Sequence, residues 1–190
     1  MTRRKSRRMG LYLYLQYTCD MRSPTLPAKR NVFNVLGFPT TIKPGFGIFL
    51  AFLVFIYPFP LGLWMAAAVG IFTLIHELGH ALAARMSGCT ASISLDFMVA
   101  YAAYEPRTPL TWGQKARIAI AGPSLQISCA IAVLLLNSTN PFSRADITIS
   151  DATIAIWWAG IALGVLNLVP LLPLDGGAFV ASIVERFMPG

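Results

Sequence analysis

The chain has 190 residues, of which 56% are hydrophobic and 12% are charged, and its formal net charge is +7 at pH 7. A soluble domain carries about 25% charged residues, so this composition argues against a soluble domain, and the long apolar blocks indicate a membrane protein. Nine of the fifteen basic residues precede residue 44, and no basic stripe interleaved with aromatic residues follows, which excludes nucleic acid as an expected partner.

The first 43 residues are polar and basic and contain several prolines, which predicts a flexible cytoplasmic tail. Residues 38–42, near the end of this tail, predict a short strand at the membrane surface. Four apolar stretches then follow as expected membrane spans. They cover residues 46–57, 62–86, 116–136 and 152–168.

Residues 88–115, between the second and third spans, combine strand-like alternation with turn residues. The last fifteen residues are moderately apolar and predict one short interfacial helix. The expected fold is an all-α membrane protein, a polytopic helical bundle of about four transmembrane helices. A small membrane-associated β element is expected after the second helix.

The distribution of lysine and arginine predicts how the chain is oriented. With the N-terminus inside, fourteen basic residues fall in cytoplasmic segments, and only Arg144 falls in an outer loop. The positive-inside rule therefore predicts a multi-pass protein of the cell (inner) membrane, with both termini in the cytoplasm.

The second span contains His76, Glu77 and His80 in the pattern His-Glu-x-x-His, and these are the only two histidines of the chain. Residues four apart share one face of a helix, so both imidazoles can bind one Zn²⁺ ion while the glutamate reaches a water molecule. The alternative is a pair of hydrogen-bonded core histidines. Ionisable side chains within a membrane span cost free energy of insertion and usually have a function, which favours the metal site.

Tetrahedral zinc in a catalytic site needs a third protein ligand, and Glu77 is reserved as the base. Asp175 is the best candidate because it follows the fourth span at the same side of the membrane as the histidines. Asp96 and Glu105 fall in the loop after the second span. Pro170 and Pro173 break the helix before Asp175, and two glycines after it allow a sharp turn. The alternative is a helix-ending turn with an incidental aspartate.

These motifs, together with the Gly122-Pro123 turn between them, resemble the site-2 protease family of intramembrane metalloproteases over about residues 36–180. The resemblance implies one zinc ion bound by His76, His80 and Asp175, with Glu77 as the catalytic base. It also implies that Asn167 lies near the metal, where it positions substrate or stabilises an oxyanion.

Family members cut single-pass transmembrane proteins within or near the lipid bilayer, and bacterial substrates include anti-sigma factors and signal-peptide remnants. The chain resembles the compact members that lack a PDZ domain. We therefore expect a basic cytoplasmic tail (1–43), an intramembrane metalloprotease domain (44–180) and a short C-terminal cytoplasmic segment (181–190).

Two positions depart from the family pattern. The third span has Gln126 where family members commonly have asparagine, and residues 98–100 read Met-Val-Ala where a Gly-Gly pair is often found.

A non-hydrolytic zinc-binding membrane protein, such as a transporter or scaffold, is the alternative function. Glu77 argues against it, because metal binding alone does not require that carboxylate. A metalloprotease with a soluble catalytic chamber is disfavoured by the lack of a sizeable soluble segment.

Overall fold

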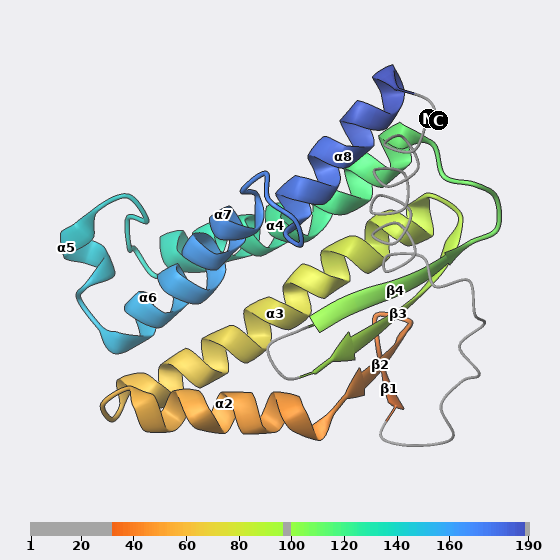
Figure 1. Cartoon of the computed structure of the whole chain (residues 1–190). Coiled ribbons are helices and arrows are strands. Elements are labelled where there is room, and N and C mark those ends of the chain that lie inside the picture. The colour runs from red at the N-terminus through yellow and green to blue at the C-terminus, as the bar shows by residue number, and fades with distance from the viewer. Residues whose placement is uncertain (1–31, 97–99, 189–190) are drawn as a thin grey trace, which may run out of the picture.

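The computed structural model describes residues 32–96 and 100–188, and it is mostly helical (Figure 1). The expected tail up to residue 31 and the Met98-Val99 pair lie outside the described residues. The main helices are α2 (Pro44–Ile56), α3 (Leu61–Met86), α4 (Trp112–Leu136), α6 (Asp151–Ile156), α7 (Leu163–Asn167) and α8 (Asp175–Phe187), with a short α5 (Arg144–Ile147). A π-helical turn, η1 (Trp157–Ala162), joins α6 to α7 in one continuous helix.

Two described helices, α3 with 26 residues and α4 with 25, are long and apolar enough to cross a membrane. They coincide with the second and third expected spans. The first and fourth expected spans are also apolar helices, but α2 has 13 residues and the helix from Asp151 to Asn167 is likewise shorter. A 13-residue helix is only about 20 Å long, against about 30 Å of hydrocarbon in a typical bilayer.

The β element is a four-stranded sheet made of β1 (Val32–Val35), β2 (Phe38–Ile42), β3 (Cys89–Leu95) and β4 (Ala100–Pro106), in that spatial order. β2 pairs in parallel with β3, and the other two pairs are antiparallel. The strand expected at 38–42 and the strands expected after α3 are therefore present. β1 was not expected, and it adds a further strand from the segment assigned to the tail.

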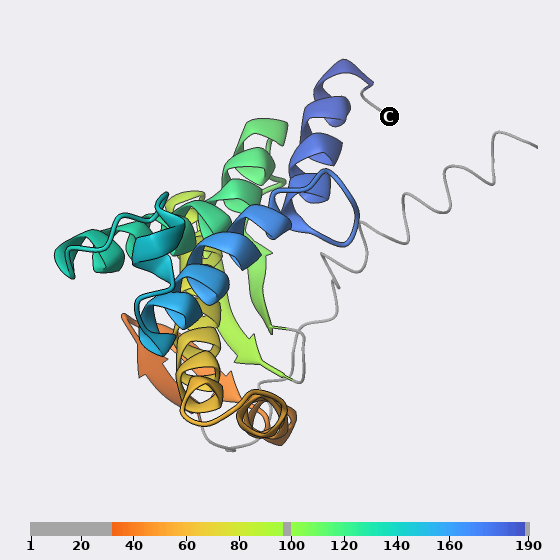
Figure 2. The same cartoon turned by 90° about the vertical axis from the view of Figure 1, so that its left-hand side faces the viewer.

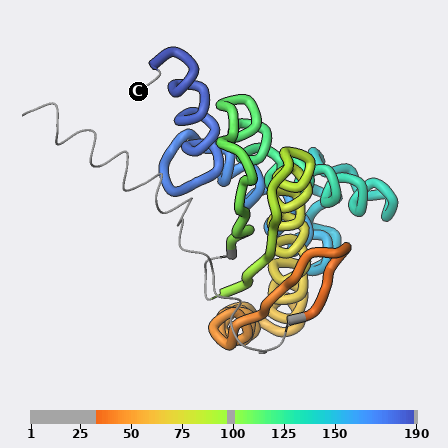
Figure 3. Tube along the Cα trace, turned by 90° about the vertical axis from the view of Figure 1, so that its right-hand side faces the viewer, coloured from red at the N-terminus to blue at the C-terminus, as the bar shows by residue number. Residues whose placement is uncertain are grey.

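The sheet lies along α3, as Figure 3 shows from one side. Phe38 and Ile93 are each 1% exposed and pack with Ala81 of α3 in one apolar cluster. The Arg85 guanidinium lies 3.6 Å from the centre of the Phe38 ring, which adds a cation–π contact between α3 and β2.

α3 is the central element of the fold. It contacts α2, α4, the α6–η1 helix and strands β3 and β4, so that it lies between the sheet and the remaining helices (Figures 1 and 2). α8 packs along the first half of α4. Residues on α3 can therefore meet residues from both sides of the molecule.

Candidate metal centre

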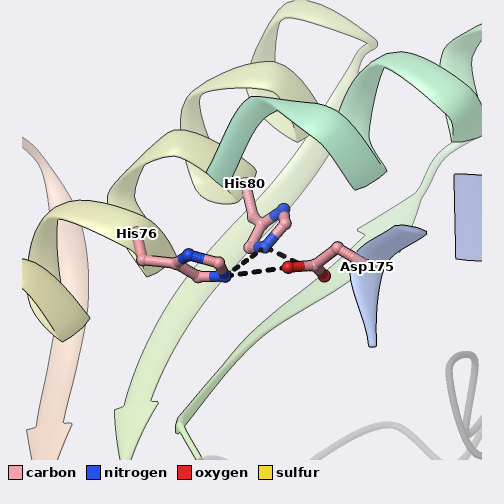
Figure 4. Close-up of side chains that lie close together, drawn as sticks. All are labelled: His76, His80 and Asp175. Atoms are coloured by element: carbon pink, nitrogen blue, oxygen red, sulfur yellow. Dashed lines mark hydrogen bonds and ion pairs between the residues drawn. The ribbon is translucent and has the colours of Figure 1, made fainter. Parts of the chain in front are cut away.

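His76 and His80 lie one turn apart on α3, and both are buried. Their Nε2 atoms are 3.0 Å apart and point toward the carboxylate of Asp175 (Figure 4). His76 Nε2 lies 3.0 Å from Asp175 Oδ2, and His80 Nε2 lies 3.3 Å from Oδ1. The structure thus brings together the three residues that the sequence predicted as ligands, although Asp175 lies 95 residues after His80.

Small residues allow α4 to approach the histidines closely. A Cβ atom at Gly79 would meet the backbone of Ala121, and one at Gly122 would meet the His80 ring. Any larger residue at either position would push α4 away from α3 or displace the imidazole. The close contact lets the backbone carbonyl of Ile118 reach His80 Nδ1 at 2.7 Å.

Asp175 opens α8, where the partial positive charge of a helix N-terminus favours a carboxylate. The two glycines after it were expected to form a sharp turn, but both lie within α8. A Cβ at Gly176 would collide with the Leu168 carbonyl, and one at Gly177 with the backbone of Leu171. The two glycines therefore allow the start of α8 to pack closely against the backbone of the preceding loop.

The outer nitrogen of each imidazole contacts an atom that only accepts hydrogen bonds. His76 Nδ1 lies 2.6 Å from Gln126 Oε1, and His80 Nδ1 lies 2.7 Å from the Ile118 carbonyl. The amide of Gln126 is oriented by its own Nε2, which donates to the Ala159 carbonyl at 2.7 Å. Both Nδ1 atoms therefore carry the proton, and in the neutral rings both Nε2 lone pairs point into the centre.

Three acceptors facing one another are stabilised by a cation between them. Two unprotonated Nε2 atoms cannot hydrogen-bond to each other, and a carboxylate offers no proton. The candidate ligand atoms of His76, His80 and Asp175 lie within 4.8 Å of one another. Ligands about 2.0–2.1 Å from a tetrahedral zinc ion would be separated by about 3.3 Å, close to the spacings observed here. The donor set and its geometry fit a zinc ion with one position left open.

The Asp175 carboxyl belongs to this electrostatic arrangement. Its burial raises the pKa, but the contacts with the two imidazoles outweigh burial and lower the pKa to about 2. The carboxylate is therefore ionised throughout the physiological range and available as a ligand.

Glu77, next to His76 on α3, is 5% exposed, and its Oε2 atom has no hydrogen-bond partner among the described residues. The backbone of Ala102 in β4 contacts the same carboxylate. A buried oxygen without a partner is costly and calls for a functional explanation. Its place beside the ligand group is suited to a base that acts on water.

The other predicted residues are placed as follows. Asn167 is the half-buried last residue of α7, and its role near the metal stays a prediction. Asp96 pairs with Lys43 at 2.9 Å, and Glu105 is exposed on β4, so neither joins the ligand group. In the sequence, Gln126 stands out only as a departure from the family pattern. Its signal in the sequence was a long amide in an apolar span.

Comparison with protein-family profiles finds no match. A protein of Synechocystis assigned as a zinc metalloprotease is 29% identical over 169 residues, which cover 81% of this chain and 44% of that protein. Rip3 of Mycobacterium tuberculosis, also assigned as a zinc metalloprotease, is 35% identical over 136 residues, 65% of this chain and 33% of Rip3. A zinc metalloprotease of Methanocaldococcus jannaschii is 24% identical, covering 82% of this chain and 45% of that protein.

The chain therefore spans between a third and a half of the length of these relatives. The solved structure of a site-2 protease from Methanocaldococcus jannaschii shares the fold, with a TM-score of 0.56 and 22% sequence identity over 82% of this chain and 71% of that one. The relatives are named as zinc metalloproteases, and the solved structure shows that the chain has the fold of a site-2 protease, in agreement with the motifs.

Proposed function

We propose that the chain is an intramembrane zinc metalloprotease that hydrolyses peptide bonds of transmembrane proteins within or near the bilayer. The observation that carries this proposal is the convergence of His76, His80 and Asp175 beside Glu77, a buried carboxylate with an unpaired oxygen. Zinc bound by the three ligands would lower the pKa of a water molecule toward about 7 and polarise the scissile carbonyl.

The residues of the chain supply the proton transfers and the orientation. Glu77 removes a proton from the attacking water and returns it to the leaving amine. Asn167 positions the substrate or stabilises the developing oxyanion. His76 and His80 keep their protons on Nδ1, since Gln126 and the Ile118 carbonyl accept them there.

The edge strand β4 is a suitable place for substrate to dock. β4 is the last strand in the spatial order of the described sheet, and the Ala102 backbone contacts Glu77. A transmembrane helix hides its peptide groups in hydrogen bonds and must unwind before cleavage. An unwound segment that adds to the sheet as a further strand would present its peptide bonds beside Glu77.

The proposed topology has four spans: α2, α3, α4 and the helix from Asp151 to Asn167. Fourteen of fifteen basic residues then lie on the cytoplasmic side, which supports cytoplasmic termini in the inner membrane. The two shorter helices are apolar and carry large exposed side chains, including Phe55 at 86% and Trp158 at 53%, as expected for lipid contact. The proposed substrates are single-pass proteins such as anti-sigma factors or signal-peptide remnants.

The test is cleavage by the purified protein reconstituted into liposomes with a panel of single-pass membrane proteins. We expect a cut within or near the substrate span that stops on addition of a zinc chelator and resumes when Zn²⁺ is restored. Cleavage that is insensitive to the chelator would refute the metalloprotease. Stoichiometric zinc without cleavage of any panel member would instead support the non-hydrolytic zinc-binding alternative.

A further inference from the structure

Gln126 is a polar side chain in the middle of an apolar helix, and it is only 3% exposed. Burying an amide is costly unless its hydrogen bonds are satisfied. Here both ends of the amide are used: Oε1 contacts His76 Nδ1 at 2.6 Å, and Nε2 donates to the Ala159 carbonyl at 2.7 Å. The side chain therefore joins α3 to the π-helical turn η1 through α4.

The Ala159 carbonyl can accept this bond because the helix changes its pattern there. In an α-helix the N–H of Leu163 would donate to Ala159, four residues back. In η1 it donates instead to the Trp158 carbonyl, five residues back. The π-helical turn thus releases the carbonyl that the Gln126 amide reaches, and such turns occur frequently at functional sites.

The surrounding packing leaves room for the long amide. Gly164 follows η1, and a Cβ atom there would collide with Ile127 and lie 3.5 Å from the Gln126 Cδ atom. At Gly160 a Cβ atom would collide with Ala130 of α4. The two glycines therefore allow the helix from Asp151 to Asn167 to pack closely against α4 beside Gln126.

We propose that Gln126 is a positioning residue for the metal centre, held by the carbonyl that the π-helical turn releases at Ala159. By accepting the Nδ1 proton of His76, it fixes the tautomer and the direction of this imidazole, so that Nε2 faces the metal. His80 is fixed separately by the Ile118 carbonyl. The two imidazoles thus depend on different hydrogen-bond acceptors: His76 on the Gln126 side chain and His80 on a backbone carbonyl.

The inference rests on the proposed zinc site and is tested by binding, without any need for hydrolysis. The chain has two histidines, so ¹⁵N-histidine NMR of the protein in nanodiscs resolves both rings. We expect Gln126→Leu to shift the His76 Nδ1 resonance, to leave that of His80 unchanged, and to lower zinc affinity by about 10–100-fold. Gln126→Asn keeps the amide and should recover part of the affinity.

The matched control is Thr153→Val in the same helix as η1. Thr153 is buried, and its hydroxyl donates to the Ile147 carbonyl at 2.7 Å, away from the ligands. We expect this change to lower thermal stability without altering zinc affinity or either histidine signal. A purely structural role for Gln126 predicts the same result for Gln126→Leu as for the control.

Unchanged zinc affinity in Gln126→Leu, or equal shifts of both histidine signals, would overturn the inference and leave the proposed function intact. An unsubstituted chain that binds no zinc would overturn both. If Gln126→Leu fails to fold, Gln126→Asn decides: a selective His76 shift with weaker zinc binding supports the inference, and an unchanged His76 signal and affinity contradict it.

Discussion

Each residue of the candidate metal centre is held in place by a specific contact with the surrounding structure. The two imidazoles are supported by Gln126 and by the Ile118 carbonyl, and Asp175 is held by the helix start that Gly176 and Gly177 permit. Second contacts of this kind orient a ligand and raise its basicity. The geometry of the site is therefore a property of the surrounding packing as much as of the ligands.

The sequence predicted which three residues meet at the candidate metal centre. His76 and His80 follow from helical spacing, and Asp175 follows from the need for a carboxylate on the same side of the membrane. The support of Gln126 and the packing task of Gly122 could not be predicted, because each depends on where a distant helix lies. The partner of Gln126 on the fourth apolar helix is 33 residues away along the chain.

Replacing Asp175 with alanine removes one of three ligands and should lower zinc occupancy together with any activity. The measurement is zinc per chain by mass spectrometry after dialysis against a weak chelator. Asp96→Ala is the control, because Asp96 pairs with Lys43 and should leave zinc unchanged. Full zinc occupancy in Asp175→Ala would show that the third ligand is assigned wrongly.

At the level of elements, the position of Asp175 is set by the packing of α8, which begins at this residue. Its far end is tied to α4 by Lys115 Nζ, which lies 2.8 Å from each oxygen of Glu185, and by Arg186, 4.7 Å from the centre of the Trp112 ring. Its near end packs against the loop through two glycines. The position of the carboxylate thus depends on both ends of one short helix.

The elements were predicted well where hydrophobic patterns are long or alternate clearly. α3, α4 and strands β2 to β4 were expected near their observed positions. β1 was not, because its four residues adjoin a polar segment and are recognisable only by their pairing with β2. The π-helical turn was not predicted either, because one extra residue in a turn does not change the hydrophobic pattern of an apolar stretch.

The glycine contact at the start of α8 leads to a prediction. Gly176→Ala should displace the start of α8, because its Cβ would collide with the Leu168 carbonyl, and zinc occupancy should fall. Gly47→Ala in α2 is the matched control, since nothing lies within 4 Å of a Cβ there. The control should be neutral or stabilise by roughly 0.5–1 kcal/mol, because alanine favours helix more than glycine. Equal zinc occupancy in both variants would mean that close packing at Gly176 does not position Asp175.

At the scale of the whole molecule, the site lies between the sheet on one side and a group of helices on the other. α3 carries the histidines and Glu77, the sheet with its edge strand β4 lies on one side, and the helices that supply Asp175 and Gln126 lie on the other. The Ala102 backbone of the sheet contacts the Glu77 carboxylate, whereas Gln126 and the Ile118 carbonyl contact the two histidines from α4.

The proposed topology can be tested by labelling in intact cells. In a background that lacks Cys19, Cys89 and Cys129, cysteine at Ile149, which is 77% exposed, should react with an impermeant thiol reagent. Cysteine at Thr108, also exposed, should not react, because residues 88–115 are expected in the cytoplasm. The opposite labelling pattern would invert the topology and move the site to the outer face.

The most direct test of the central claim is the pair of measurements on Glu77→Gln: zinc content and cleavage of a substrate. Glutamine keeps the shape of the side chain and all three metal ligands but cannot take a proton from water. We expect zinc near one ion per chain and a fall in cleavage rate of at least the 10²–10⁴-fold that a general base contributes. Cleavage at the unsubstituted rate by the zinc-loaded variant would contradict the role of Glu77 and with it the proposed mechanism.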